Sequence, residues 1–321
     1  MRRRWLSAAA TTGVALMAAA SGQTPPALLR IDVGISARTG IAPLVLAQGA
    51  GIFERHRLDV VLHPLADKDL GFALQNGGVA CGAAAAESWI VWNANGLAAA
   101  QIFAIDRSAG ADALVARPGI GKIADLKGRT IAAGPIGSSN YFQLAWVLAK
   151  NGAAIGDVHV LNLDDEPADN AFASGAASLD AVLAGEPFLS QLRDRPELGN
   201  ALASTGDSWS VTEPFGCAAR FLAANPGAGR ALAESFFEAL ELIRREPQKS
   251  FATMGAAVRQ SAEQFEASQR SVRWQDRAAN RRWLARDHAA FAKEAGDLLL
   301  AIGAIKQAPD PARLIDARFV P

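Results

Sequence analysis

Apolar and polar positions along the first hundred residues alternate between strand-like and helix-like stretches. Residues 29–35 alternate as in a first strand, and the apolar run over 58–63 predicts a second. Residues 41–48 and 67–76 are predicted to be helices, because glycines close each of them. Strands that alternate with helices in this way favour an α/β fold, in which helices cover both faces of a parallel-type sheet.

The same pattern continues through the middle of the chain and changes near its end. Further strands are predicted over 79–82, 98–105, 112–117, 129–133, 158–163, 179–183 and 215–222, with helices over 87–94, 141–150 and 167–173. From residue 229 onward the chain is mostly helical, with amphipathic helices over 231–245 and 278–303. Ligands of such sheets bind beyond the carboxyl ends of the strands. The loops at 36–39, 83–88 and 106–108 therefore fall on one rim.

One helix start stands out as a binding feature. After the predicted strand 129–133, residues 134–137 break the chain, and Ser138, Ser139 and Asn140 are good N-cap residues. A helix start leaves backbone N–H groups unpaired and carries a partial positive charge, which suits an anion or a polar oxygen. An ordinary capped helix after a strand is the plainer interpretation.

The N-terminus has the features of a secretory signal peptide. Residues 2–4 are all arginine, residues 6–20 form an apolar stretch too short to span a bilayer, and residues 18–20 offer an A-x-A cleavage site. We therefore expect residues 1–20 to be removed and the mature protein to be soluble in the periplasm. General export is favoured over the twin-arginine route, which the initial arginines resemble only weakly.

Composition narrows the partners and the chemistry. Lys and Arg together equal Asp and Glu at 32 each, so no overall charge favours nucleic acid or an anionic membrane. The four histidines are scattered without metal-ligand spacing, and we expect neither a metal nor a required cofactor. Cys81 and Cys217 are the only cysteines, and the sequence leaves open whether they pair or remain two buried thiols.

The order of several short motifs resembles a known family. The motifs are Gln-Gly-Ala-Gly-Ile-Phe at 48–53, Asp-Arg-Ser-Ala-Gly-Ala-Asp at 106–112, Ile-Ala-Asp-Leu-Lys-Gly at 123–128, Ser-Ser-Asn-Tyr at 138–141 and Gly-Glu-Pro at 185–187. Together they resemble the taurine, sulfonate and nitrate (NMT1-like) group of periplasmic substrate-binding proteins, which serve ABC importers. The resemblance covers about residues 28–320.

The resemblance implies a clamshell of two lobes, the type II periplasmic binding protein fold. Each lobe would hold a parallel-type sheet with flanking helices. Two crossing segments, near residues 106–110 and 213–216, would form the hinge. Lobe 1 would comprise residues 28–107 plus 218–321, and lobe 2 would comprise residues 108–217. A monomer is expected, because both lobes of a clamshell must be free to move.

The resemblance also implies a set of cleft residues. They are Ser36, Arg38, Thr39, Glu87, Ser88, Asp106, Ser108, Ser138, Ser139, Asn140, Gly185 and Glu186. Family members commonly carry an aromatic residue at the position of Gly185, so glycine predicts room for a bulkier ligand, although it could equally relax the loop. Trp209, with Trp89 and Trp92 as core or ligand-wall alternatives, could supply a stacking face.

These expectations lead to a solute-binding function. The protein is expected to capture a small organic anion or zwitterion of the sulfonate or carboxylate class and to present it to an inner-membrane ABC permease. A bulkier aromatic acid, such as a quinone-like or pterin-like cofactor, is the larger ligand that Gly185 suggests. Arg38 suits an acidic group, whereas Glu87, Asp106 and Glu186 argue for N–H donors on the ligand.

Two other functions remain as alternatives. A periplasmic sensor or cofactor-delivery protein would share the same fold, and the sequence does not separate it from an importer component. An enzyme related to thiamine-pyrimidine synthesis is disfavoured, because no histidine falls in a predicted cleft loop and the pair Ser138–Ser139 lacks a G-x-S-x-G context.

Overall fold

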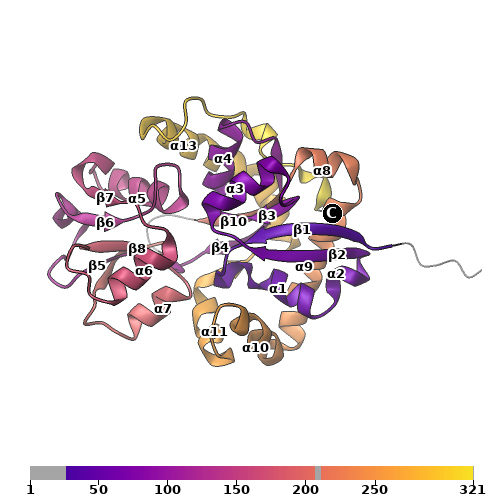
Figure 1. Ribbon diagram of the computed structural model, residues 1–321, viewed down its shortest axis with the longest axis horizontal. Coiled ribbons are helices and arrows are strands. Elements are labelled where there is room, and N and C mark those ends of the chain that lie inside the picture. The colour runs from indigo at the N-terminus through magenta and orange to yellow at the C-terminus, as the bar shows by residue number, and fades with distance from the viewer. Residues whose placement is uncertain (1–26, 207–210, 321) are drawn as a thin grey trace, which may run out of the picture.

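Two β-sheets organise the chain into two lobes that lie side by side (Figure 1). The computed structural model describes residues 27–206 and 211–320. The predicted signal peptide at 1–20 and the predicted ligand contact Trp209 lie outside the described residues. Within the described ranges, no helix is both long enough and apolar enough to cross a membrane.

Lobe 1 contains a six-stranded sheet in the order β11-β4-β10-β3-β1-β2. Its strands are β1 (Leu29–Ile35), β2 (Leu58–Pro64), β3 (Cys81–Ala83), β4 (Ala99–Ser108), β10 (Thr212–Ala218) and β11 (Val272–Trp274). Strands β1, β2 and β3 are parallel, whereas β10 is antiparallel to both β3 and β4, and β11 is antiparallel to β4.

Helices cover both faces of this sheet (Figure 1). The larger core lies against α1 (Ala42–Gly49), α2 (Ile52–Arg55), α9 (Ala228–Arg245), α10 (Pro247–Ala257) and α11 (Ala262–Ser268). On the other face lie α3 (Asp67–Asn76) and α4 (Ala86–Ala94), with α13 (His288–Ala301) packed beyond α4. Two short helices complete the lobe, α8 (Ala219–Ala224) and α12 (Arg277–Arg282).

Lobe 2 contains a five-stranded sheet in the order β7-β6-β8-β5-β9. Its strands are β5 (Asp112–Ala116), β6 (Thr130–Ala132), β7 (His159–Leu161), β8 (Ala181–Gly185) and β9 (Asn200–Ser204). One face packs on α5 (Ser139–Lys150), and the other packs on α6 (Asp165–Ala173) and α7 (Phe188–Arg193).

The predicted α/β two-lobe fold is confirmed, but its sheets are mixed rather than parallel. Strand β4 carries the chain out of lobe 1 and β10 brings it back, so the two pair antiparallel. In lobe 2, β5 likewise runs antiparallel to both of its neighbours, β8 and β9. The boundaries of the lobes at residues 107/108 and 217/218 stay a prediction.

Several elements differ from the predicted ones. The predicted strand 215–222 ends at Ala218 and continues as α8, whose Ala-rich sequence favours a helix. The predicted helix 278–303 is close to continuous, with a π-helical turn (Trp283–Asp287) between α12 and α13. The periodicity did not predict α7, β9 or β11, since short segments carry little periodic signal. Helices α10 and α11 fall in the stretch after residue 229 that was predicted to be mostly helical, but their bounds were not predicted.

A disulfide bond between Cys81 and Cys217 joins β3 to β10. The two residues are directly opposite one another in the antiparallel register, and both are fully buried. The two cysteines are therefore paired, which the sequence alone left open. It closes a covalent loop over a sequence separation of 136 residues, and this loop contains the whole of lobe 2.

We expect the double variant Cys81→Ala/Cys217→Ala to be less stable than the natural protein. Removing a cross-link that closes so long a loop restores conformational freedom to the unfolded chain, and the free energy of unfolding should fall by about 3 to 5 kcal/mol. Urea unfolding with and without a thiol reductant measures the effect. The reductant should lower the midpoint of the natural protein and leave that of the variant unchanged; an unchanged midpoint in both would contradict the prediction.

Candidate functional site

The two strands that cross between the lobes place a pair of carboxyl groups at the junction. Asp106 near the end of β4 lies opposite Glu213 near the start of β10 in the antiparallel register. Both residues are buried, with 4% and 5% of their surface exposed. Directly opposite residues have their Cβ atoms about 5 Å apart, so the two carboxyl groups are close neighbours.

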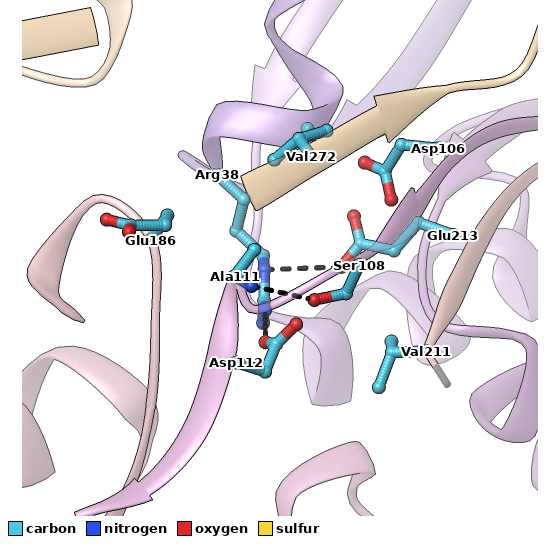
Figure 2. A pocket seen from close by; sticks show the side chains of 10 residues that line it. Arg38, Asp106, Ser108, Ala111, Asp112, Glu186, Val211, Glu213 and Val272 are labelled. Atoms are coloured by element: carbon cyan, nitrogen blue, oxygen red, sulfur yellow. Dashed lines mark hydrogen bonds and ion pairs between the residues drawn. The ribbon is translucent and has the colours of Figure 1, made fainter. Parts of the chain in front are cut away.

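Arg38 links these strands to lobe 2. It lies in the loop after β1, and its Nε atom is 3.2 Å from Oε1 of Glu213. Its Nη2 atom donates a hydrogen bond to Asp112, the first residue of β5. Its Nη1 atom is 3.8 Å from Oδ2 of Asp165 at the start of α6. One guanidinium group from lobe 1 thus contacts carboxyl groups of both lobes (Figure 2).

These groups surround a small interlobe cavity of about 20 Å³. A cavity of this size has room for about one water molecule. Its charged lining consists of Arg38, Asp106, Asp112, Glu186 and Glu213. The remaining lining residues are Gly40, Ser108, Ala111, Val211 and Val272. Within the described ranges, no group of three or more His, Cys, Asp or Glu residues is arranged to hold a metal ion.

A second polar contact between the lobes lies at the start of α5. The Ser139 hydroxyl donates to Oε1 of Glu87 on α4 at 2.6 Å. The neighbouring Asn140 donates from Nδ2 to Oδ1 of Asp165 at 2.8 Å. Ser138 is the N-cap, and its hydroxyl oxygen accepts from the backbone N–H of Tyr141 at 3.2 Å. The side chains at this helix start are therefore engaged by the chain itself, two of them with carboxyl groups.

Burial shifts the acidity of these carboxyl groups. It raises the pKa of Glu213 to about 7, although the charge of Arg38 opposes the shift. Burial likewise raises the pKa of Glu87 to about 7, against the hydrogen bond from Ser139. Burial and the facing Glu213 together raise the pKa of Asp106 well above its ordinary value. Glu87 and Glu213 therefore change their protonation state near neutral pH.

Of the predicted site residues, four line this cavity, namely Arg38, Asp106, Ser108 and Glu186. Glu186 is held in place by Arg193, whose Nη1 donates to Oε1 at 2.6 Å, and by the backbone N–H of Ser190 at 3.0 Å.

The other predicted positions differ in their surroundings. Thr39 is fully buried, with Oγ1 3.5 Å from Oγ of Ser268. The hydroxyl oxygens of Ser36 and Ser88 are buried and have no hydrogen-bond partner among the described residues. Binding roles for all these residues stay predictions.

The space beside Gly185 is filled, not open. A Cβ atom at this position would lie 2.7 Å from Nη2 of Arg38 and 3.0 Å from Oδ1 of Asp112. Glycine therefore permits the close approach of the Arg38 guanidinium, and the room expected for a bulkier ligand is absent from this arrangement. Trp89 is a core residue, fully buried, with Nε1 donating to the carbonyl of Ala84 at 3.2 Å.

Sequence reasoning missed three carboxylates that contact Arg38, namely Asp112, Glu213 and Asp165. A signal was present for two of them. Asp112 follows the first predicted crossing segment, and Glu213 lies in the second. Antiparallel pairing of the two crossings would have placed Glu213 opposite Asp106.

Comparisons with known proteins agree with this architecture. The model of the NMT1/THI5-like family matches residues 38–250. A binding protein of Brucella abortus (strain 2308) is 28% identical over 220 residues, and this match spans 66% of each chain.

Solved structures with the same fold include the alkanesulfonate-binding protein SsuA from Xanthomonas axonopodis pv. citri bound to MOPS. Its TM-score is 0.74 at 22% identity, over 90% of this chain and 99% of that one. The periplasmic nitrate-binding protein NrtA from Synechocystis PCC 6803 has a TM-score of 0.67 at 14% identity, over 87% and 86%. At these identities the likeness establishes the fold.

We expect Arg38→Gln to destabilise the protein, because Asp112 and Glu213 lose their buried counter-charge. Removing one partner of a buried ion pair lowers the free energy of unfolding by roughly 3 to 5 kcal/mol. Adding Glu213→Gln to this variant should restore part of the loss, since the uncompensated charge then disappears. Urea unfolding measures both variants. The control is Arg55→Gln, which breaks a surface pair with Glu238 and should change stability by less than about 1 kcal/mol.

The Arg38 prediction has a clear contrary outcome. An Arg38→Gln protein as stable as the natural one would show that the buried pairs do not stabilise the folded state.

We expect the protein without added solute to become less stable as pH rises from 6 to 8. The pKa values of Glu87 and Glu213 rise from 4.5 to about 7 on folding, so the folded protein holds more protons than the unfolded chain in this window. Stability then falls with increasing pH. Burial lowers the pKa of His288 from 6.5 to about 4, and its opposite effect is largely complete by pH 6.5. The melting temperature should be lower at pH 8 than at pH 6, and Glu213→Gln should reduce the difference. A rise over this range would refute the assignment.

Proposed function

This chain belongs to the NMT1/THI5-like family, and from that premise we propose that it is a periplasmic solute-binding protein of an ABC importer. It captures a small organic ligand between its lobes and presents the closed form to an inner-membrane permease. The observation that carries the proposal is the convergence of buried polar side chains from both lobes on one interlobe cavity, between the strands that join the lobes.

The polar side chains of the site are divided between the two lobes, and this division explains how a ligand would bring the lobes together. Arg38 and Glu87 belong to lobe 1, whereas their partners Asp112, Asp165 and Ser139 belong to lobe 2. A ligand that contacts both groups binds better when the lobes are together, and it therefore shifts the protein toward the closed arrangement. In sequence the chain passes between the two sheets twice, after β4 and before β10, so we expect the change in angle at these ends of the two strands.

The charges of the cavity favour some ligands over others. Four carboxyl groups and one guanidinium line it, and the guanidinium is already paired. A plain inorganic anion would meet mostly like charge, whereas a zwitterion or an anion that also carries N–H donors would meet both of the partners it needs. At about 20 Å³ the cavity holds about one water molecule, so any organic solute requires the lobes to separate from this arrangement, and a flat aromatic acid requires the widest separation.

Binding, and not catalysis, is the proposed activity. The polar lining consists of carboxyl groups, one arginine and the Ser108 hydroxyl, which lies 2.6 Å from the Thr205 hydroxyl and also accepts from the backbone of Ala111. Among the described residues, the hydrogen bonds of that hydroxyl go to Thr205 and to the Ala111 backbone and not to a carboxyl or imidazole group, which supports binding over nucleophilic catalysis.

A thermal-shift screen of the mature protein tests the function. The panel comprises taurine, alkanesulfonates, nitrate, amides, aminopyrimidines and aromatic carboxylic acids. We expect one chemical class to raise the melting temperature saturably, because a ligand that binds only the folded state stabilises it by mass action. Calorimetry should give one site per chain, and the ligand should be recovered unchanged.

Two variants of lobe 2 localise the binding. Asp112→Asn should weaken it about tenfold or more, because the hydrogen bond from Arg38 to lobe 2 then loses its charged acceptor. Glu197→Gln, an exposed carboxyl outside the cavity, should leave the affinity unchanged. A panel without any shift, or a ligand converted to product, would argue against a solute-binding function.

A further inference from the structure

The facing carboxyl groups of Asp106 and Glu213 form one wall of the interlobe cavity (Figure 2). Oε1 of Glu213 lies beside Nε of Arg38, but Oε2 is buried and has no hydrogen-bond partner among the described residues. A buried carboxylate oxygen without a donor is unfavourable, and such groups in folded proteins normally have partners. This oxygen therefore accepts either the proton of the facing Asp106 carboxyl group or a donor that enters the cavity from outside the chain.

The groups that would hold an anion are already engaged. Arg38 is shared among the carboxyl groups of Asp112, Glu213 and Asp165. At the start of α5, Ser139 donates to Glu87 and Asn140 donates to Asp165. A sulfonate or carboxylate entering the cleft would have to displace these carboxylates from their donors.

The cavity lining carries more carboxyl groups than positively charged groups. Of the four carboxyl groups that line the cavity, Glu186 is matched by Arg193, and Asp112 is matched by Arg38. The positive charge of Arg38 is then only partly available to stabilise the carboxyl groups of Asp106 and Glu213. Two buried carboxyl groups side by side do not both ionise easily, and either a proton or a cation must compensate them.

We propose that the cleft recognises a positively charged N–H group on its ligand, an ammonium, amidinium or guanidinium, seated between the carboxyl groups of Asp106 and Glu213. The inference rests on the proposed function and specifies the ligand class of the same site. Such a group supplies a donor for Oε2 of Glu213 and replaces the proton that the carboxyl pair otherwise holds. An acidic group elsewhere on the ligand is tolerated but does not provide recognition.

Matched pairs of compounds test this proposal directly. Taurine and isethionate differ only in an ammonium group against a hydroxyl, and butylammonium and butanol differ in the same way. Acetamidinium against acetamide and methylguanidinium against methylurea extend the set to planar cations. Calorimetry and thermal shift at fixed ionic strength compare the members of each pair.

We expect binding only among the cations that carry N–H groups. Asp106→Asn and Glu213→Gln should each weaken the binding of the best cation about 10- to 100-fold, the usual effect of losing a hydrogen bond to a charged group. Glu197→Gln is the matched control, because it removes an exposed carboxyl of lobe 2 without touching the cavity. Melting temperatures of the variants without ligand confirm that each is folded.

Two outcomes would overturn the proposal while the solute-binding function stands. One is equal binding of isethionate and taurine, or binding confined to anions of the wider panel. The other is full affinity for the best cation in both Asp106→Asn and Glu213→Gln, which would show that the pair merely shares a proton. If no compound of either the matched pairs or the wider panel binds, the solute-binding function fails as well.

Discussion

The guanidinium of Arg38 is the contact on which the arrangement of the two lobes depends. Arg38 lies in the loop after β1 of lobe 1, and its guanidinium contacts Asp112 and Asp165 of lobe 2. Its Nε atom also contacts Glu213 on β10. Buried carboxyl groups this close together repel one another unless a cation compensates them. The same side chain therefore stabilises the closed interface and decides how much positive charge remains for a ligand.

The protein thus uses the family's fold with a cleft dominated by carboxyl groups. Solved relatives with this fold include proteins named for alkanesulfonate and nitrate, whereas four carboxyl groups line the cavity here. A shared fold does not determine function, which depends on the individual side chains of the site. Under the proposed function, the choice of solute would therefore depend on Asp106, Glu213 and their neighbours more than on the family.

Hydrophobic periodicity and turn residues predicted those helices and strands that depend on neighbouring residues in the chain. The strand expected over 29–35 and the helix expected over 67–76 have those bounds in the structure. Contacts between lobes were beyond such signals, because Arg38 and its partner Asp112 are 74 residues apart and no periodicity relates them. Gly185 shows the same limit, since its missing side chain suggested open space that a residue from the other lobe fills.

The bond between Cys81 and Cys217 also changes what a proteolytic cut would do. All five strands of lobe 2 lie between the two cysteines in sequence, as do both crossings and the exposed loops that connect those strands. A single cleavage anywhere in residues 82–216 therefore leaves one covalently joined molecule. Each fragment of a chain nicked in this way keeps part of the six-stranded sheet, β1 and β2 on one side of the cut and β11 on the other, so the two remain tethered within the sheet of lobe 1.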